Sequence, residues 1–202
     1  MRFTGDHTLQ APVADVWKAL LDPHVLVRTI PGCERLEETS STDTEHAYAM
    51  TVTAGVAAIK GTYTGSCVLS DLVEHESLTM RLDGAGAPGT VGATVRVRFA
   101  GDGDGTTVTY DADAVVGGMV GGVGQRMLTS VSRRMAGEFF GNVDDVLTGR
   151  RGHFVPPAEP GMPATYVDAS RRTRVDSQRD FLTGVGVGAG LVLLGVLLGR
   201  RR

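Results

Sequence analysis

Residues 90–147 read TVGATVRVRFAGDGDGTTVTYDADAVVGGMVGGVGQRMLTSVSRRMAGEFFGNVDDVL and carry the clearest structural pattern in this chain. Their first part alternates apolar and polar residues in two runs separated by GDGDG, which is typical of strands with one buried face. Further on, apolar residues recur at helical spacing at Val120, Val123, Met127, Val131, Met135, Phe139, Val143 and Leu147. This stripe predicts one long amphipathic helix that packs on the preceding strands.

The same two-residue alternation extends back to about residue 34, and its polar parity carries threonines, arginines and aspartates. Such strands form an antiparallel sheet with one solvated and one covered face. Residues 3–9 predict a first strand, and residues 13–21 carry a helical stripe directly after Pro12. A second short helical segment is expected at residues 25–29. This order of elements predicts an α+β fold, in which a curved antiparallel sheet wraps on a long C-terminal helix.

Small residues occupy part of the covered parity, namely Ala54, Gly65, Ala93, Ala112 and Ala114. A face packed tightly on a helix normally carries larger side chains, so these positions predict either very close approach or open space. We favour an open apolar cavity with methionines as adaptable walls. The residues predicted to bind a ligand there are Met50, Val52, Tyr63, Gly65, Cys67, Met80, Leu82, Val95, Val97, Phe99, Tyr110, Ala112, Ala114, Met119, Val123, Met127 and Val131.

No catalytic or metal-binding residues are predicted. The run GAGAPG at residues 84–89 matches a dinucleotide-binding fingerprint, but a strand follows where that motif needs a helix, so a turn between strands is expected. The five histidines are scattered, without cysteines or carboxylates at metal-ligand spacing. Cys33 and Cys67 have no basic neighbour in the sequence that would activate a thiol, so neither is predicted to be a nucleophile.

Composition and charge argue against several classes of protein. The 202 residues carry a formal net charge of −3, and no basic stripe marks the N-terminal two thirds, so no nucleic-acid partner is expected. The two cysteines are far apart and no secretory leader precedes the first strand, so no disulfide framework is expected. Residues 1–149 are therefore predicted to form one domain on the cytoplasmic side.

The composition changes after residue 149. Residues 150–180 contain four prolines and no apolar period, which predicts a flexible linker with a reach of about 30 Å. The next 19 residues, FLTGVGVGAGLVLLGVLLG, carry no charge and as a helix would measure about 28 Å, close to a hydrocarbon core of about 30 Å. Residues 181–202 are thus predicted to be a hydrophobic membrane anchor that either spans the bilayer or lies in its interface, with a buried core helix as the alternative. The residues expected to meet lipid are Phe181, Leu182, Leu191, Leu194, Leu198, Arg200, Arg201 and Arg202.

Four short motifs carry a resemblance to a known family: APVADVW (11–17), LLDP (20–23), IPGCE (30–34) and GTYTG (61–65). Together with the long helix that follows, they resemble CoxG, a family of carbon monoxide dehydrogenase subunits within the START-like (SRPBCC) helix-grip superfamily. The resemblance implies a seven-stranded antiparallel sheet that grips the last helix over an apolar cavity. It also implies association with a molybdenum hydroxylase of the carbon monoxide dehydrogenase type and recruitment of that enzyme to the membrane. It implies no catalytic residues.

These features predict an accessory protein rather than an enzyme. A soluble dehydrogenase must pass electrons to a respiratory quinone, and menaquinone or ubiquinone is too hydrophobic to leave the bilayer unaided. An apolar cavity tethered to the cytoplasmic side of the cell membrane would extract the quinone and present it to the enzyme. Two alternatives remain open: a purely structural anchor that binds no ligand, and a cyclase-like enzyme whose polar groups would be Tyr63 and Tyr110.

Overall fold

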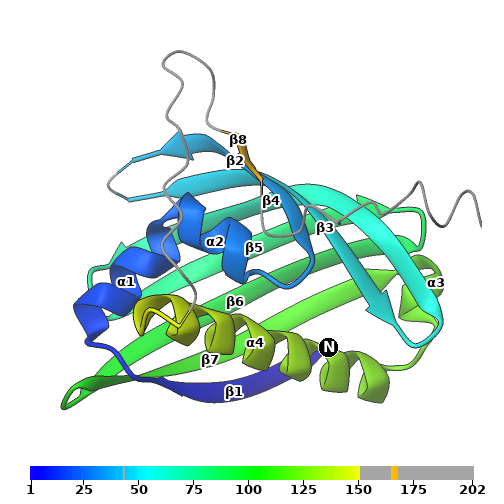
Figure 1. Ribbon diagram of the computed structural model, residues 1–202. Coiled ribbons are helices and arrows are strands. Elements are labelled where there is room, and N and C mark those ends of the chain that lie inside the picture. Colours follow the sequence, from blue (N-terminus) through cyan, green and yellow to red (C-terminus); the bar gives the residue numbers. More distant parts are fainter. Residues whose placement is uncertain (43, 151–164, 168–202) are drawn as a thin grey trace, which may run out of the picture. The chain divides into compact units, whose positions relative to one another are not determined.

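A curved antiparallel sheet forms the body of the protein (Figure 1). The computed structural model describes residues 1–42, 44–150 and 165–167. Its strands are β1 (Arg2–Leu9), β2 (Cys33–Ser41), β3 (His46–Val56), β4 (Ile59–Val73), β5 (Ser77–Gly86), β6 (Gly89–Asp102), β7 (Gly105–Gly117) and β8 (Thr165–Val167). They pair in the order β1-β7-β6-β5-β4-β3-β2-β8, antiparallel throughout. The turns that join β2 to β7 in succession therefore alternate between the two ends of the sheet.

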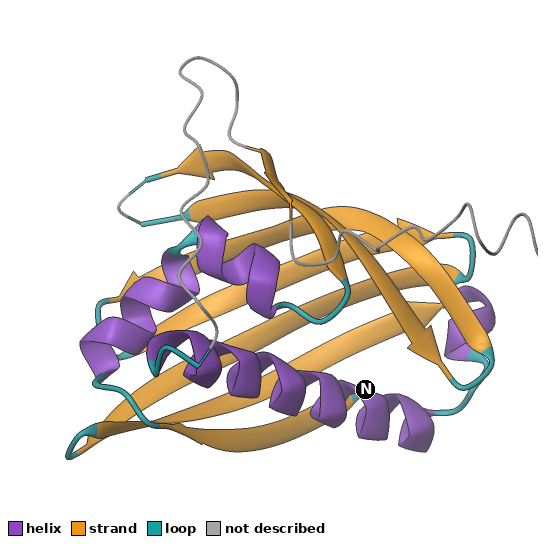
Figure 2. Ribbon diagram, in the orientation of Figure 1, coloured by secondary structure: helices purple, strands orange, loops and turns teal. Residues whose placement is uncertain are grey.

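Helices lie over the concave face of this sheet (Figure 2). The first, α1 (Val13–Leu21), matches its predicted span, and α2 (Pro23–Thr29) starts two residues before its predicted position. The carboxylate of Asp22 caps α2 by accepting a hydrogen bond from the backbone N–H of His24 at 2.8 Å. Pro23 suits the first helical position because its ring presets φ and its missing N–H would be unpaired there.

The predicted single C-terminal helix is broken near its start, which corrects the sequence-based expectation. A short turn, α3 (Gly118–Gly121), comes first, and α4 (Gln125–Leu147) begins after Gly124. Gly124 has a φ of +91°, a conformation that L side chains rarely adopt, so the glycine permits the break.

The predicted apolar stripe is confirmed in the second half of α4, where Val143 is buried and Phe139 and Leu147 pack against the core. The buried residues of α4 are Leu128, Phe140 and Val143. In the first half of α4 the predicted stripe of Met127, Val131 and Met135 is exposed or partly exposed instead. The one buried residue in this half of α4 is Leu128, which the predicted stripe did not include.

The predicted faces of the sheet are confirmed by burial. In β6, Val95, Val97 and Phe99 are buried and the intervening Arg96 and Arg98 are exposed. The fold class predicted from the sequence is therefore correct: an α+β fold with seven long antiparallel strands and a long C-terminal helix, to which the three-residue β8 is added. The GAGAPG run forms the expected turn between β5 and β6.

One half of the concave face, here called the closed half, is covered by α1, α2 and the second half of α4. The Trp17 ring packs edge-on against Phe99 at 5.5 Å between centroids. The Tyr48 hydroxyl donates to the Leu21 carbonyl at 3.2 Å, and the Asn142 amide of α4 donates to the Thr29 carbonyl at 2.9 Å. Burial of each large apolar side chain here contributes roughly 1.5–3 kcal/mol, so the closed half is the main source of stability.

The strand β8 lies inside the predicted linker and corrects that part of it. Its residues pair with β2, with Val167 opposite Arg35 and Thr165 opposite Glu37. The remaining residues predicted as linker after Arg150, and the predicted anchor at 181–202, lie outside the described residues. In the ranges that the structure describes, no helix is both long enough and apolar enough to cross a membrane.

Candidate functional site

The other half of the concave face, here called the open half, is apolar but only partly covered. It lies toward the end of the sheet that carries the β3–β4 and β5–β6 turns, below the first half of α4. Its partly exposed apolar residues are Met50, Val52, Tyr63, Met80, Leu82, Val91, Ala93, Val116, Val131 and Met135. An accessible apolar surface on a concave face is a candidate site for a hydrophobic ligand, because binding removes that surface from water.

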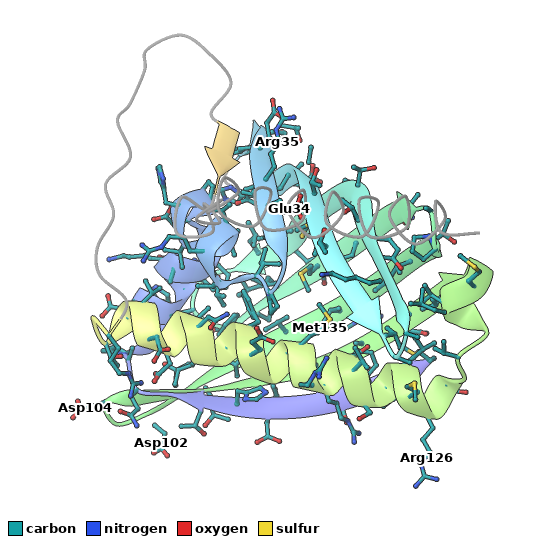
Figure 3. The ribbon with its side chains drawn as sticks, turned by 45° about the vertical axis from the view of Figure 1, so that its right-hand side comes forward. Glu34, Arg35, Asp102, Asp104, Arg126 and Met135 are labelled. Atoms are coloured by element: carbon teal, nitrogen blue, oxygen red, sulfur yellow. The ribbon has the colours of Figure 1, made fainter. Side chains whose placement is uncertain are left out.

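Methionines surround this surface. Met135 projects from α4 over the concave face (Figure 3). Met127, in the first turn of α4, is 45% exposed, and Met119, in α3, is 63% exposed. The flexible thioether side chain adapts to ligands of different shape, so this composition favours binding of an extended apolar molecule rather than rigid packing.

Backbone pairing places five residues of neighbouring strands in one row across the open half. The row runs Met50, Gly65, Gly84, Val91 and Val116, from β3 to β7. Two adjacent glycines thus lie at its centre, with larger apolar side chains on both sides. Because glycine has no side chain, the surface is recessed at the centre of the row, which leaves room for a ligand.

The two glycines of this row exist for different physical reasons. A Cβ on Gly65 would lie 2.0 Å from the Asp83 carbonyl oxygen and 2.7 Å from the Gly84 Cα, so Gly65 allows close approach of two strands. A Cβ on Gly84 would find only the Thr64 carbonyl oxygen, at 3.9 Å. Gly84 therefore faces open space. Close approach of the strands explains the glycine at position 65, and open space surrounds the glycine opposite it at position 84.

The structure divides the 17 predicted ligand-binding residues into three groups. Partly exposed are Met50, Val52, Tyr63, Gly65, Met80, Leu82, Val123 and Val131, and more exposed still are Met119 and Met127. The rest are buried: Cys67, Val95, Val97, Phe99, Tyr110, Ala112 and Ala114. Sequence reasoning missed Gly84 at the centre of the row, because a residue without a side chain adds nothing to a hydrophobic period.

Ala112 and Ala114 are correspondingly 1% and 5% exposed. Their small side chains therefore mark close packing rather than open space, which corrects the expectation for these two positions.

The two tyrosines considered as polar groups do not converge. Tyr110 is buried beneath α4 beside β1, with its ring 6.4 Å from that of His7 and 6.2 Å from that of Phe140. Only Tyr63 belongs to the open half. Burial raises the pKa of both hydroxyls, and for Tyr110 the nearby Arg133 partly opposes this. A phenol with a raised pKa is a weaker acid, so this pair gives no arrangement for acid–base chemistry.

Cys67 is an unreactive core residue. Burial raises the pKa of its thiol to about 12. The thiolate is the nucleophilic form, so this side chain does not act in covalent chemistry at neutral pH.

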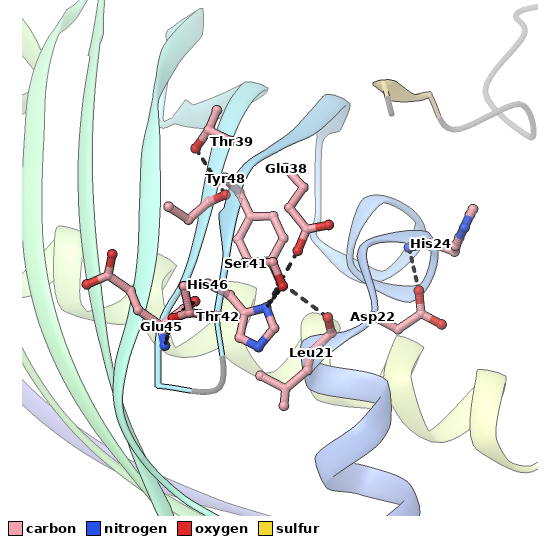
Figure 4. Close-up of polar contacts among 11 residues, drawn as sticks. Leu21, Asp22, His24, Glu38, Thr39, Ser41, Thr42, Glu45, His46 and Tyr48 are labelled. Atoms are coloured by element: carbon pink, nitrogen blue, oxygen red, sulfur yellow. Dashed lines mark hydrogen bonds and ion pairs between the residues drawn. The ribbon is translucent and has the colours of Figure 1, made fainter. Parts of the chain in front are cut away.

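A polar cluster at the turn between β2 and β3 resembles hydrolase machinery only in composition (Figure 4). Ser41 Oγ lies 3.1 Å and Glu38 Oε1 3.5 Å from Nδ1 of His46. In a catalytic triad the serine and the acid contact different ring nitrogens, so that the imidazole relays a proton between them. Here both groups approach the same nitrogen, and the cluster stabilises the turn.

This architecture places the protein in the helix-grip class, in which a curved antiparallel sheet grips a long C-terminal helix. The model of the CoxG family, which is described as a carbon monoxide dehydrogenase subunit, matches residues 5–148. The chain belongs to this family, as its motifs predicted. Members of the family are accessory subunits of carbon monoxide dehydrogenase.

Solved structures agree with this assignment. A conserved protein from Geobacillus kaustophilus is 30% identical, and the match covers 73% of this chain and 95% of that chain with a TM-score of 0.67. The Zhui aromatase/cyclase from a Streptomyces species is 18% identical over 74% of this chain and 94% of that chain, with a TM-score of 0.58. A protein from Thermus thermophilus is 13% identical over 75% and 100%, also at 0.58. The last two show the shared fold alone. A comparison with curated proteins finds no match.

Proposed function

We propose that this protein is an accessory subunit of carbon monoxide dehydrogenase that carries a hydrophobic molecule on its open half. The observation that carries the proposal is the row of apolar residues that remain partly exposed around Gly84, while the closed half is tightly packed. A protein stabilised by burial leaves such a surface accessible at a cost unless a ligand covers it.

The ligand we propose is a respiratory quinone, menaquinone or ubiquinone. Oxidation of carbon monoxide to carbon dioxide consumes water and releases two protons and two electrons, and a quinone takes up the same number to become a quinol. The isoprenoid chain of a quinone is flexible and apolar, which suits a methionine-rich surface. The enzyme would then receive its electron acceptor from this subunit instead of reaching into the bilayer.

The tether belongs to the same proposal. The uncharged sequence at residues 181–199, followed by three arginines, has the length and composition of a membrane anchor. We place the domain on the cytoplasmic side of the cell membrane, where the enzyme is recruited to lipid and quinone together.

A purely structural anchor is the second candidate. The burial of seven predicted ligand-binding residues favours it, because this part of the concave face is filled by the protein itself. A cyclase-like enzyme has less support, because Tyr63 is the only one of the two tyrosines on the open half.

The test is mass spectrometry of organic extracts from the full chain purified out of a host with respiratory quinones. Gly84→Phe places a ring in the space above the row, whereas Gly84→Ala adds one methyl group where the nearest other atom is 3.9 Å away. We expect near-stoichiometric quinone in the native chain and in Gly84→Ala, and loss of quinone in a folded Gly84→Phe. Equal quinone in all three, or none in any, contradicts the carrier function.

A further inference from the structure

The two ends of the sheet differ in charge. One end, here called the apolar end, is formed by the β3–β4 turn (residues 56–60), the β5–β6 turn (86–89) and the segment that leads into α4 (117–127). These segments read VAAIK, GAPG and GGMVGGVGQRM, so their only charged residues are Lys60 and Arg126. The open half of the concave face adjoins this end.

The opposite end is acidic. The β4–β5 turn carries Glu74 and Glu76, and the β6–β7 turn carries Asp102 and Asp104, all of them exposed. Figure 3 shows Asp102 and Asp104 at one end of the domain and Arg126 at the other. The turns at the two ends of the sheet therefore differ in charge, with cations at the apolar end and carboxylates at the opposite end.

Two carboxylates near the apolar end, Asp83 and Asp113, have cationic partners. Asp83 of β5 lies 3.4 Å from Nε of Arg81, and Asp113 of β7 lies 3.9 Å from the N-terminal amine. Their charges are thus partly offset locally, which weakens their repulsion of an anionic surface.

Exposed apolar side chains complete this surface. Met119 is 63% and Met127 45% exposed, and Ala57 and Ala58 are exposed at the tip of the β3–β4 turn. Single exposed apolar residues are ordinary, but here they occur on neighbouring segments and are flanked by cations. Apolar groups with surrounding Lys and Arg are what the interface of an anionic bilayer accommodates, with the apolar part among acyl chains and the cations at phosphates.

We propose that the apolar end docks on the anionic membrane surface, so that the open half faces the lipid from which its ligand enters. This inference rests on the proposed carrier function for its purpose, although the docking can be measured without any ligand. A membrane is favoured over a protein partner because the surface combines small and flexible apolar groups with cations, and has no fixed complementary shape to match.

The experiment compares two labelled positions in the full chain bound to vesicles of phosphatidylglycerol and phosphatidylcholine that contain a spin-labelled quencher lipid. Met119→Cys labels the apolar end and Asp104→Cys labels the acidic end with the same fluorophore. The native cysteines are buried: Cys33 is 1% exposed and Cys67 is 8% exposed. We expect strong quenching at position 119 and little at 104. Replacing phosphatidylglycerol with phosphatidylcholine should reduce the quenching at 119.

Charge reversal adds a matched control. Lys60→Glu with Arg126→Glu should lower the ratio of docked to undocked domain by about fivefold for each cation removed. Lys18→Glu with Arg98→Glu changes the net charge equally at exposed sites away from the apolar end and should leave the ratio unchanged.

Three results overturn the proposal: equal quenching at both positions, quenching at position 104 alone, or protection of the label at 119 by added dehydrogenase but not by lipid. Quinone content measured in the same samples distinguishes a failure of membrane docking from a failure of the carrier function. Bound quinone without quenching at 119 refutes membrane docking and leaves the carrier intact.

Discussion

Gly65 and Gly84 form a matched pair for testing how the open half is built. They are opposite each other on β4 and β5 and share the concave face. Substitution of each by alanine adds the same methyl group in the same row of the sheet, so intrinsic strand propensity cancels between the two variants. The difference in stability then reports only what surrounds each Cβ.

The magnitudes follow from the distances. At Gly65 the new Cβ would lie 2.0 Å from the Asp83 carbonyl oxygen, and both neighbours are backbone, so β4 and β5 must separate. We expect a cost near the upper end of the roughly 1–3 kcal/mol that overpacking causes. At Gly84 the nearest atom is 3.9 Å away, so the new methyl group meets no clash. Both substitutions restrict the unfolded chain alike, and this stabilisation of about 0.4–1 kcal/mol cancels between them. The two variants should therefore differ by the overpacking cost at Gly65 alone, up to about 3 kcal/mol.

Urea unfolding of the full chain measures this difference through the fluorescence of Trp17, the single tryptophan, which is 7% exposed. In thermal unfolding the same difference corresponds to roughly 6–12 °C in Tm at about 2–4 °C per kcal/mol. Equal stability of the two variants would refute the distinction between close approach and open space, and with it the placement of the ligand above Gly84.

Three further predictions concern the closed half, the polar face of the sheet and the buried thiol. Phe140→Ala removes a ring that packs against His7, Tyr110 and Phe139 and should cost about 3–5 kcal/mol in urea unfolding, whereas a cost below about 1 kcal/mol would contradict its place in the core. The hydrogen bond from Arg2 holds the pKa of Asp111 below its usual value, so this carboxylate favours the folded state above the ordinary aspartate pKa of about 3.9 and loses that effect as pH falls through the lower folded value. Chemical-shift titration should show this lowered pKa in the native chain and its return toward the ordinary value in Arg2→Ala. The Cys67 thiol, with a pKa of about 12, should resist alkylation at pH 8 in the folded chain and react on unfolding in urea, and rapid modification of the native protein would show that its strand is not closed.

Much of the fold was predictable because its signals are local. Alternation along β6 and β7 identified the buried parity, and Pro12 and the Asp22-Pro23 pair marked helix starts that the structure confirms. The helix after Val120 was predicted as one unit because glycines weaken a helical pattern without revealing where it breaks. The three-residue β8 had no periodic signal at all, and its pairing with β2 depends on a strand that lies about 130 residues earlier in the chain.

The candidate site was predictable only in outline. The sequence assigned Val95, Tyr110 and Ala112 to the same covered parity as Met50 and Leu82, and it correctly expected an apolar concave face. Within that parity, the positions that are buried depend on which helix lies above them, and this is set by the path of α1, α2 and α4 across the sheet. Alternation along one strand tells which side chains share a face, whereas the burial of that face depends on the helices that pack on the sheet.

The amino-acid sequence alone thus determined the α+β class, the family, the apolar face and the change in composition after residue 149. Tertiary structure decided which half of that face stays accessible, why Gly65 and Gly84 differ, and how cations and carboxylates separate to opposite ends. The physical reason is that burial, Cβ clearance and the gathering of charges from distant turns depend on contacts between segments far apart in the chain, and no local pattern encodes them.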